Sequence, residues 1–308
     1  MLLVLDVGNT NTTLGLYDGE ELKHSWRLTT ERQRTVDEYG IMCRTLLQLC
    51  GLESSSVTDI AVSSVVPPLD FTLHKMIEVY FRVEPLFVDT TNAGMKVLYD
   101  DPKEVGADRV VNAVAAFAKY GGPCIAVDFG TATTFDAISR EGEYLGGIIC
   151  PGIQISADAL FQRAARLRRI DIRRPDQIIG TNPTASVQSG LYYGNIALVD
   201  GILEKMIEEL GAQTRVVATG GLAPLISRGS RLIEAVDSDL TLEGLRIIYE
   251  RNKGASYNSL VVGCVASAFF DSREERKEVK RFVPDFVDSC GKSLLLNVAA
   301  PGYHHQRR

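Results

Sequence analysis

The sequence predicts an α/β protein built from two similar lobes with a cleft between them, and three observations support this. A short apolar run that ends in an acid, a glycine and a threonine occurs twice, within residues 2–13 and within 124–134. Each copy is followed by further strand-like runs, and strand-like and helical segments then alternate in both halves. Alternation of this kind is typical of α/β folds, and its repetition indicates a duplicated architecture.

The first lobe is expected to cover residues 1–120 and to open with a three-strand meander. Leu2–Leu5 is wholly apolar, as a buried strand would be, and leads into the turn at Asp6-Val7-Gly8-Asn9-Thr10. Pro67-Pro68 suits the first turn of a helix, and Gly121-Gly122-Pro123 breaks the last helix of the lobe. The other elements expected here are strands at 12–17, 22–28, 60–66 and 86–88 and helices at 36–50, 67–81 and 107–120.

The second lobe is expected to cover residues 121–253 and to repeat this plan. Its first strand, 124–127, ends at Asp128-Phe129-Gly130-Thr131-Ala132-Thr133. The remaining elements expected are strands at 133–138, 144–149 and 215–219 and helices at 153–167, 188–210 and 240–250. Residues 254–308 depart from the pattern and receive no role, and their charge run at 272–281 is interpreted as a solvated helix or linker.

Composition excludes several classes of protein. The chain has 308 residues, a net charge of -6 and a pI near 5.4, which argues against a nucleic-acid binder. It shows no signal-peptide pattern and no apolar run long enough to cross a membrane, so we expect a cytoplasmic protein. No C-x-x-C pair occurs among the six cysteines, and Cys124 and Cys150 are interpreted as buried small hydrophobic residues.

The two acid-glycine-threonine turns suit phosphate chemistry. Gly8 permits close approach of a phosphate, and the residues after it, Asn9, Thr10, Asn11 and Thr12, offer hydrogen-bond donors. An acid at the end of a strand cannot bind phosphate directly, but it can hold Mg²⁺ that bridges phosphate oxygens. If the lobes are related by a pseudo-twofold axis, Asp6 and Asp128 face each other, which outlines a phosphoryl-transfer site. The alternative is that both are ordinary tight turns.

Other nucleotide motifs are absent or ambiguous. The chain has no G-x-x-x-x-G-K-[ST] loop, and no G-x-G-x-x-G follows a strand, which disfavours a dinucleotide fold. Gly220-Gly221 follows the expected strand at 215–219. A glycine pair there lets a flat group such as adenosine lie against the backbone, or it simply forms the turn into a helix.

Taken together, the motifs resemble those of type III pantothenate kinases. The resemblance runs in order from residue 1 to about residue 253. It is carried by DVGNTNTT at 6–13, GADR at 106–109, DFGTATT at 128–134, GGIICPG at 146–152, QSG at 188–190 and ATGG at 218–221.

This resemblance implies the duplicated actin-like (ribonuclease H-like) ATPase fold and a homodimer. It implies ATP-dependent phosphorylation of pantothenate, the first step to coenzyme A, with Mg²⁺ and a monovalent cation, K⁺ or NH₄⁺. By motif, Asp108 is the catalytic base, and Asp128 lies at the monovalent cation. The ATP contacts implied are Asp6, Val7, Gly8, Asn9, Thr10, Asn11, Thr12, Thr13 and Thr131, and the pantothenate contacts are Tyr99, Gly106, Ala107, Asp108 and Arg109.

The role of Asp108 also makes chemical sense, because an alcohol acceptor must lose its proton as the phosphoryl group arrives. Arg109 beside it could pair with the carboxylate of pantothenate. The alternative for Asp108-Arg109 is a helix N-terminal acid with a local ion pair. One departure from the family pattern is Pro183, which stands where a substrate-holding threonine is expected and so removes a hydroxyl and an N–H; Thr184 could substitute.

Two other functions fit the same fold. Another actin-like small-molecule kinase would share the phosphate turns and differ only in its acceptor pocket, against which GADR and Tyr99 argue. A non-catalytic transcriptional accessory factor would keep the fold without activity. The presence of all three acids, Asp6, Asp108 and Asp128, favours an active enzyme.

Overall fold

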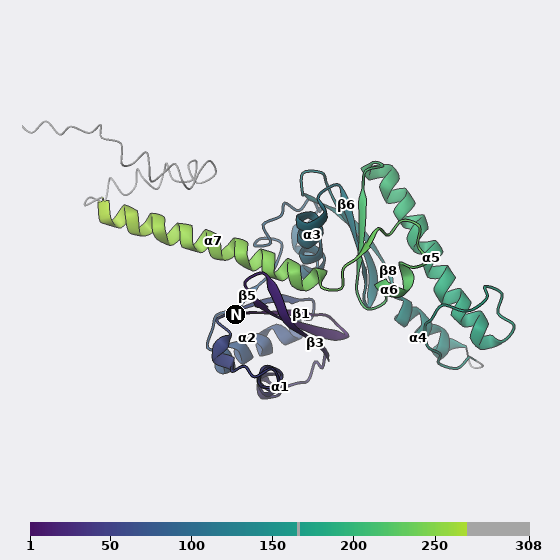
Figure 1. Ribbon diagram of the computed structural model, residues 1–308, viewed down its shortest axis with the longest axis horizontal. Coiled ribbons are helices and arrows are strands. Elements are labelled where there is room, and N and C mark those ends of the chain that lie inside the picture. Colours follow the sequence, from purple (N-terminus) through teal and green to yellow (C-terminus); the bar gives the residue numbers. More distant parts are fainter. Residues whose placement is uncertain (165–166, 270–308) are drawn as a thin grey trace, which may run out of the picture. The chain divides into compact units, whose positions relative to one another are not determined.

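The computed structural model describes the backbone of residues 1–164 and 167–269, with side chains as far as Gly254 (Figure 1). The sheet of the first half is five-stranded, in the order β3-β2-β1-β4-β5. Its strands are β1 (Leu2–Val7), β2 (Asn11–Asp18), β3 (Glu21–Thr29), β4 (Asp59–Ser64) and β5 (Leu86–Phe87). β1 is central because its side chains are apolar on both faces, whereas the edge strand β3 alternates between exposed and partly buried residues.

The second sheet repeats the first strand for strand, in the order β8-β7-β6-β9-β10. Its strands are β6 (Cys124–Phe129), β7 (Ala132–Ile138), β8 (Tyr144–Pro151), β9 (Arg215–Thr219) and β10 (Ala235–Val236). β1 pairs antiparallel with β2 and parallel with β4, and β6 pairs in the same two ways with β7 and β9. The predicted duplicated α/β fold is therefore confirmed.

Seven α-helices and two short 3-10 helices are present in the described residues. They are α1 (Val36–Leu49), α2 (Pro67–Phe81), α3 (Ala107–Tyr120), α4 (Ile153–Arg163), α5 (Pro183–Leu210), α6 (Ala223–Ile226), α7 (Leu240–Phe269) and the 3-10 helices Ser54–Ser56 and Pro102–Glu104. Local sequence sets several starts. Thr35 and Glu38 form a reciprocal capping box for α1, and Pro67 occupies the first turn of α2, where its missing N–H costs nothing.

Three helix boundaries differ from the sequence prediction by more than one residue. α4 ends at Arg163, earlier than expected, and α7 continues to Phe269, well beyond 250. α5 begins at Pro183 rather than at 188, because the Asn182 side chain accepts a hydrogen bond from the backbone N–H of Ala185 and caps the helix there. The charge run at 272–281 lies outside the described residues.

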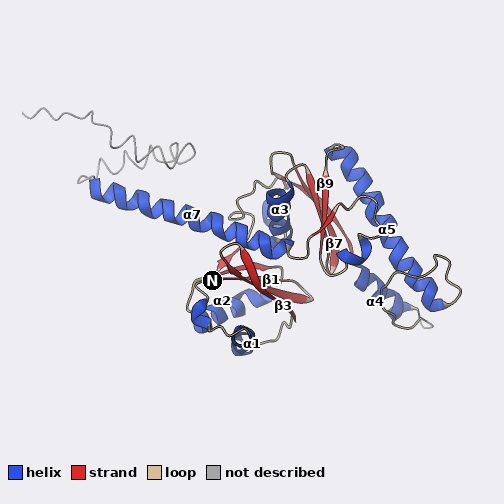
Figure 2. Cartoon of the chain, in the orientation of Figure 1, coloured by secondary structure: helices blue, strands red, loops and turns tan. Residues whose placement is uncertain are grey.

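The elements are layered, with one helical layer between the two sheets (Figure 2). Side chains alternate along β1, so Leu3, Leu5 and Val7 pack against α1 and α2 on one face. On the other face, Leu2 and Val4 join a cluster with α3 and the first turns of α7, and β6 contributes Cys124 and Ala126 to the same cluster. The opposite face of β6 packs against α5. Both sheets thus bury one face against the same central helices.

The duplication places the two acids at equivalent positions. Asp6 pairs in register with Thr13 of β2 and Ser63 of β4. Asp128 pairs with Thr134 of β7 and Thr219 of β9. Each acid is therefore the last but one residue of a central strand, between a threonine and a second hydroxyl residue. The turn that follows the strand is one residue longer in the first half.

Candidate active site

Three carboxylates converge where β1, β6 and the first turn of α3 meet. Burial, and then the negative charges of Asp108 and Asp128, raise the pKa of Asp6 to about 8. Burial, and then the charges of Asp108 and Asp136, raise the pKa of Asp128 to about 7. Burial likewise raises the pKa of Asp108, against the hydrogen bond from the backbone N–H of Arg109. Like charges this close are stabilised by a bound cation.

The two phosphate-type turns touch each other. The hydroxyls of Thr10 and Thr131 lie 2.8 Å apart and form a hydrogen bond. Each turn is closed in the same way, since the N–H of Gly8 bonds the carbonyl of Asn11 and the N–H of Gly130 bonds that of Ala132, both at 3.0 Å. Thr10 and Thr131 are exposed, so their hydroxyls and the neighbouring backbone N–H groups are accessible to a phosphate.

Not every residue of the predicted ATP-binding segment has a side chain that a ligand could reach. Val7 is fully buried in the core beneath α1 and α2. Thr12 is also buried, and its hydroxyl lies 2.9 Å from that of Thr30. Asn9 is exposed, and its side-chain oxygen accepts a hydrogen bond from Arg32 at 2.7 Å. Val7 and Thr12 therefore shape the turn, and only their backbone groups could contact a ligand.

Gly220 is required by the position of Asp128. Its φ is +90°, a conformation that residues with a Cβ rarely adopt, and a Cβ there would lie 2.5 Å from Oδ1 of Asp128. The neighbouring Gly221 faces Nη1 of Arg27, which a Cβ would meet at an ordinary 3.5 Å. Arg27 is exposed on β3, and its positive charge lowers the pKa of both Asp6 and Asp128. The glycine pair therefore lies directly against the acidic centre.

Asn112 joins the site through the helix geometry of α3. It lies one turn after Asp108, is almost fully buried, and donates a hydrogen bond to Oδ2 of Asp128 at 3.3 Å. Its side-chain oxygen accepts from the hydroxyl of Thr241 in α7 at 2.7 Å. The sequence prediction omitted both Asn112 and Arg27. The i, i+4 spacing from Asp108 is the signal that could have revealed Asn112.

Arg109 makes a different ion pair from the local one considered as an alternative. Asp108 accepts from the backbone N–H of Arg109, whereas the guanidinium turns to Asp136 in β7. Its Nε donates to Oδ1 of Asp136 at 2.8 Å, and Nη2 lies 2.7 Å from the same oxygen. The hydroxyl of Tyr144 also donates to this oxygen at 2.8 Å. Asp136 is an acid inside an apolar strand, and such a residue requires a buried partner.

Tyr99 is brought beside Arg109 by an added strand contact. The segment before it pairs with the edge of β8, where Leu98 donates its N–H to the carbonyl of Tyr144 and Tyr144 donates to that of Lys96, both at 2.8 Å. The rings of Tyr99 and Tyr144 then lie 6.5 Å apart. Gly147 of GGIICPG is required here, since a Cβ would lie 1.9 Å from the carbonyl oxygen of Phe135 in β7 and 2.7 Å from Nη2 of Arg109. The predicted pantothenate residues Tyr99 and Arg109 are thus neighbours.

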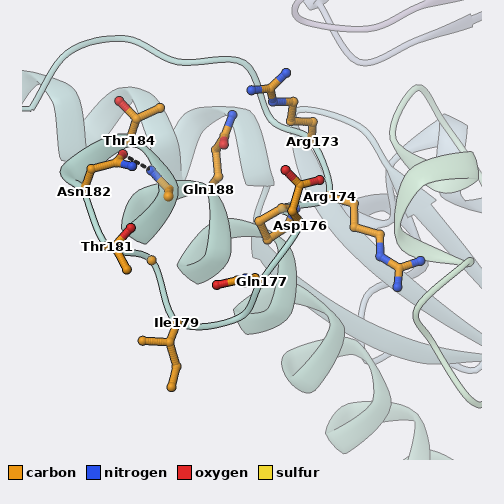
Figure 3. Close-up of a pocket in the computed structure, with 12 residues that line it drawn as sticks. Arg173, Arg174, Asp176, Gln177, Ile179, Thr181, Asn182, Thr184 and Gln188 are labelled. Carbon is orange, nitrogen blue, oxygen red and sulfur yellow. Dashed lines mark hydrogen bonds between the residues drawn. The ribbon is translucent and has the colours of Figure 1, made fainter.

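A cavity of about 450 Å³ lies elsewhere, at the N-terminus of α5 (Figure 3). Arg173 and Asp176 line it from the loop, and Asn182, Thr184 and Gln188 line it from the helix. None of the predicted catalytic or nucleotide-binding residues lines this cavity. Pro183 fits the first helical position, where the N–H it lacks would have no partner in the helix.

Further expectations concern metals, thiols and membranes. Among residues with described side chains, no cluster of three or more His, Cys, Asp or Glu residues is arranged to hold a metal. Cys124 is buried, as predicted, and burial raises the pKa of its thiol to about 12. The same prediction for Cys150 is wrong, because that residue is only partly buried. No helix in the described part of the chain is long and apolar enough to cross a membrane.

Comparison with known proteins identifies relatives over most of the chain. The family model described as type III pantothenate kinase matches residues 2–205. Proteins named type III pantothenate kinase are 57% identical in Koribacter versatilis and 58% identical in an Anaeromyxobacter species. Each alignment covers 82% of this chain, and they cover 96% and 100% of the respective relatives.

The relationship extends to more distant bacteria and to a solved structure. The type III pantothenate kinase of Geobacillus kaustophilus is 53% identical over 82% of this chain and 98% of its own length. A protein from Campylobacter jejuni described as a Baf family transcriptional activator has a similar structure, with a TM-score of 0.52, 19% identity, and coverage of 82% of this chain and 99% of its own. That similarity shows the shared fold.

Proposed function

Because the chain belongs to the type III pantothenate kinase family, we propose how its residues carry out the phosphorylation of pantothenate. The chain is a pantothenate kinase that uses ATP and a divalent metal and produces 4'-phosphopantothenate, the first intermediate of coenzyme A biosynthesis. The observation that carries the residue assignment is that the charges of Asp108 and Asp128 act on the Asp6 carboxyl, and that of Asp108 on Asp128, so these three acids are near neighbours.

Asp6 and Asp128 hold the cations of the site. Carboxylate oxygens are the ligands that Mg²⁺ prefers, and one or two of them suffice when substrate phosphates complete the coordination. Burial and then repulsion between the acids raise the pKa of both carboxyls, and a cation would offset both effects, so the two carboxylates fit. We assign Asp6 to Mg²⁺ and Asp128 to a monovalent cation, K⁺ or NH₄⁺. When bound, the divalent ion neutralises charge on the transferring phosphoryl group.

The two turns bind the phosphates of ATP. Thr10 and Thr131 turn exposed hydroxyls toward the junction of the lobes, and a phosphate inserted there would replace their mutual hydrogen bond. Gly8, Asn9, Asn11 and Thr13 extend the set of donors along the first turn. Arg27 adds positive charge on the same side, which favours a polyanionic ligand. The adenosine lies against Gly220-Gly221.

Asp108 is the general base. It lies in the first turn of α3 beside the other two acids, and its raised pKa makes it a better proton acceptor than an ordinary aspartate. It accepts the proton of the pantothenate hydroxyl as that oxygen bonds the γ-phosphorus, and ADP leaves. Gly106 and Ala107 give the substrate access, while Tyr99 contacts pantothenate and Arg109 pairs with its carboxylate.

A coupled assay that measures ADP release tests this assignment. Asp108→Asn should lower kcat by about 10²–10⁴-fold while ATP binding persists, because only the proton acceptor is lost. Asp100→Asn, an exposed acid of the preceding loop, is the matched control and should behave as wild type. Full activity in Asp108→Asn would refute the base, and ATP turnover indifferent to pantothenate in the wild type would refute the substrate.

Exposed apolar side chains favour a homodimer as the assembled form. They lie on β8, on α4 and in the loop before α5, and include Ile148, Ile149, Ile155, Leu160, Ile178 and Ile179. A surface of this kind is usually covered by a partner, and we propose that the partner is a second copy of this chain in the cytoplasm. Light scattering should give twice the monomer mass, and Ile149→Glu should shift it to the monomer.

A further inference from the structure

The guanidinium of Arg109 has hydrogen-bonding capacity that the protein does not use. Its side chain is only 9% exposed. Nε is satisfied by Asp136, but Nη2 is buried and makes no hydrogen bond of acceptable geometry, although it lies 2.7 Å from an oxygen of Asp136. A buried donor without an acceptor is costly. A carboxylate entering beside Tyr99 would supply the missing acceptor.

The orientation of this guanidinium depends on Asp136. The Asp136 carboxylate is fully buried and is itself held by the hydroxyl of Tyr144 at 2.8 Å and, more loosely, by that of Thr134 at 3.4 Å. The guanidinium carbon of Arg109 lies 5.9 Å from the centre of the Tyr144 ring, which adds a favourable cation–π contact. The ion pair with Asp136 and the contact with the Tyr144 ring thus fix the Arg109 side chain, and the two hydroxyls fix Asp136 in turn.

The competing orientation points toward the catalytic acids. Asp108 is the neighbour of Arg109 in sequence, and the positive charge of Arg109 already lowers the pKa of Asp108 against the effect of burial. Without Asp136, the guanidinium would turn to Asp108. That movement would withdraw it from the substrate and pair it with the base.

We propose that Asp136, supported by Tyr144, is the positioning residue that holds Arg109 toward the substrate carboxylate and so selects an acid over uncharged analogues. This inference rests on the proposed function, in which Arg109 meets the carboxylate of pantothenate. Asp136 itself touches neither substrate nor ATP in this proposal.

Steady-state kinetics of Asp136→Asn and Tyr144→Phe test the proposal, with pantothenol, the alcohol counterpart of pantothenate, as a competing ligand. Asp136→Asn should raise the KM for pantothenate by about 10–100-fold, the worth of a hydrogen bond to a charged group. Tyr144→Phe, which keeps the ion pair, should raise it by about 3–10-fold. The KM for ATP and the inhibition constant of pantothenol should stay within about twofold, since neither involves the carboxylate.

Glu143→Gln is the matched control, because this substitution also removes one negative charge beside Tyr144. Glu143 pairs with Lys96, whose side chain is exposed, and not with Arg109. Equal weakening of pantothenate and pantothenol, or a wild-type KM in both variants, would overturn the proposal. If Asp136→Asn fails to fold, Tyr144→Phe decides by the same criteria. A wild-type enzyme without pantothenate kinase activity would instead refute the proposed function.

Discussion

Replacing Asp128 by Asn should stabilise the ligand-free protein while removing the cation site proposed at this residue. Asp128 is the last but one residue of β6, beside two other acids, and burial and their charges raise its pKa from 3.8 to about 7. A folded-state pKa above the unfolded value means that the folded protein binds the proton more tightly. Stability therefore falls as pH rises from about 4 to about 7, and stays low above that range. The asparagine carries no charge and avoids this cost.

The magnitude follows from the shift of about three pKa units. At pH 8.5 Asp128 is ionised in both the folded and the unfolded state, and the full shift lowers the free energy of unfolding by about 4 kcal/mol. At pH 5 the folded group is protonated and the cost is only about 1.6 kcal/mol. Because Asp128 keeps some solvent access, water reduces these values, and we expect a difference of about 2 kcal/mol between the two pH values. The side-chain oxygen of an asparagine at position 128 can accept the hydrogen bond that the Asn112 amide now donates to Asp128.

Thermal melts of wild type and Asp128→Asn at pH 5 and pH 8.5, without nucleotide or divalent metal, measure this effect. The difference in Tm between the variant and the wild type should be about 4 °C or more larger at pH 8.5 than at pH 5, in favour of the variant. Asp18→Asn removes an exposed acid at the end of β2 and should show no such pH dependence. Adding K⁺ and MgATP should stabilise the wild type more than the variant.

The reasoning would be refuted if Asp128→Asn were destabilised equally at both pH values. That result would mean that Asp128 is held by favourable contacts rather than strained by its acidic neighbours. Activity offers a separate check, because the more stable variant should be nearly inactive.

Three further outcomes are expected. Gly220→Ala should cost about 1–2 kcal/mol of backbone strain and abolish activity by displacing Asp128, as melts and the coupled assay will show. Gly201→Ala is its control, because a Cβ at Gly201 in α5 would meet nothing within 4 Å. Arg27→Ala should raise the KM for ATP about tenfold and leave that for pantothenate unchanged; equal increases in both would contradict the assignment. The affinity for Mg²⁺-nucleotide should rise from pH 6 to pH 8.5 as Asp6 and Asp128 lose their protons, and a flat calorimetric profile would contradict this.

The sequence predicted most of the fold because its signals are local. Apolar runs such as Leu2–Leu5, the prolines that open α2 and the glycines that close α3 act within a few residues, so these elements lie where they were expected. The start of α5 was misplaced because the capping role of Asn182 was not recognised. The two-residue strand β10 was missed because it is defined only by its partner β9.

Two acids of the candidate site, Asp6 and Asp128, were predicted from the repeated acid-glycine-threonine turns alone, and their roles stay predictions. Only the tertiary structure decided which side chains pair with one another. Arg109 turns to Asp136 rather than to its neighbour Asp108, and Asn112 reaches Asp128 across the junction of the lobes. The physical reason is that the pairing of buried charges depends on which strands and helices pack together. No local sequence pattern states which distant residues this packing brings close in space.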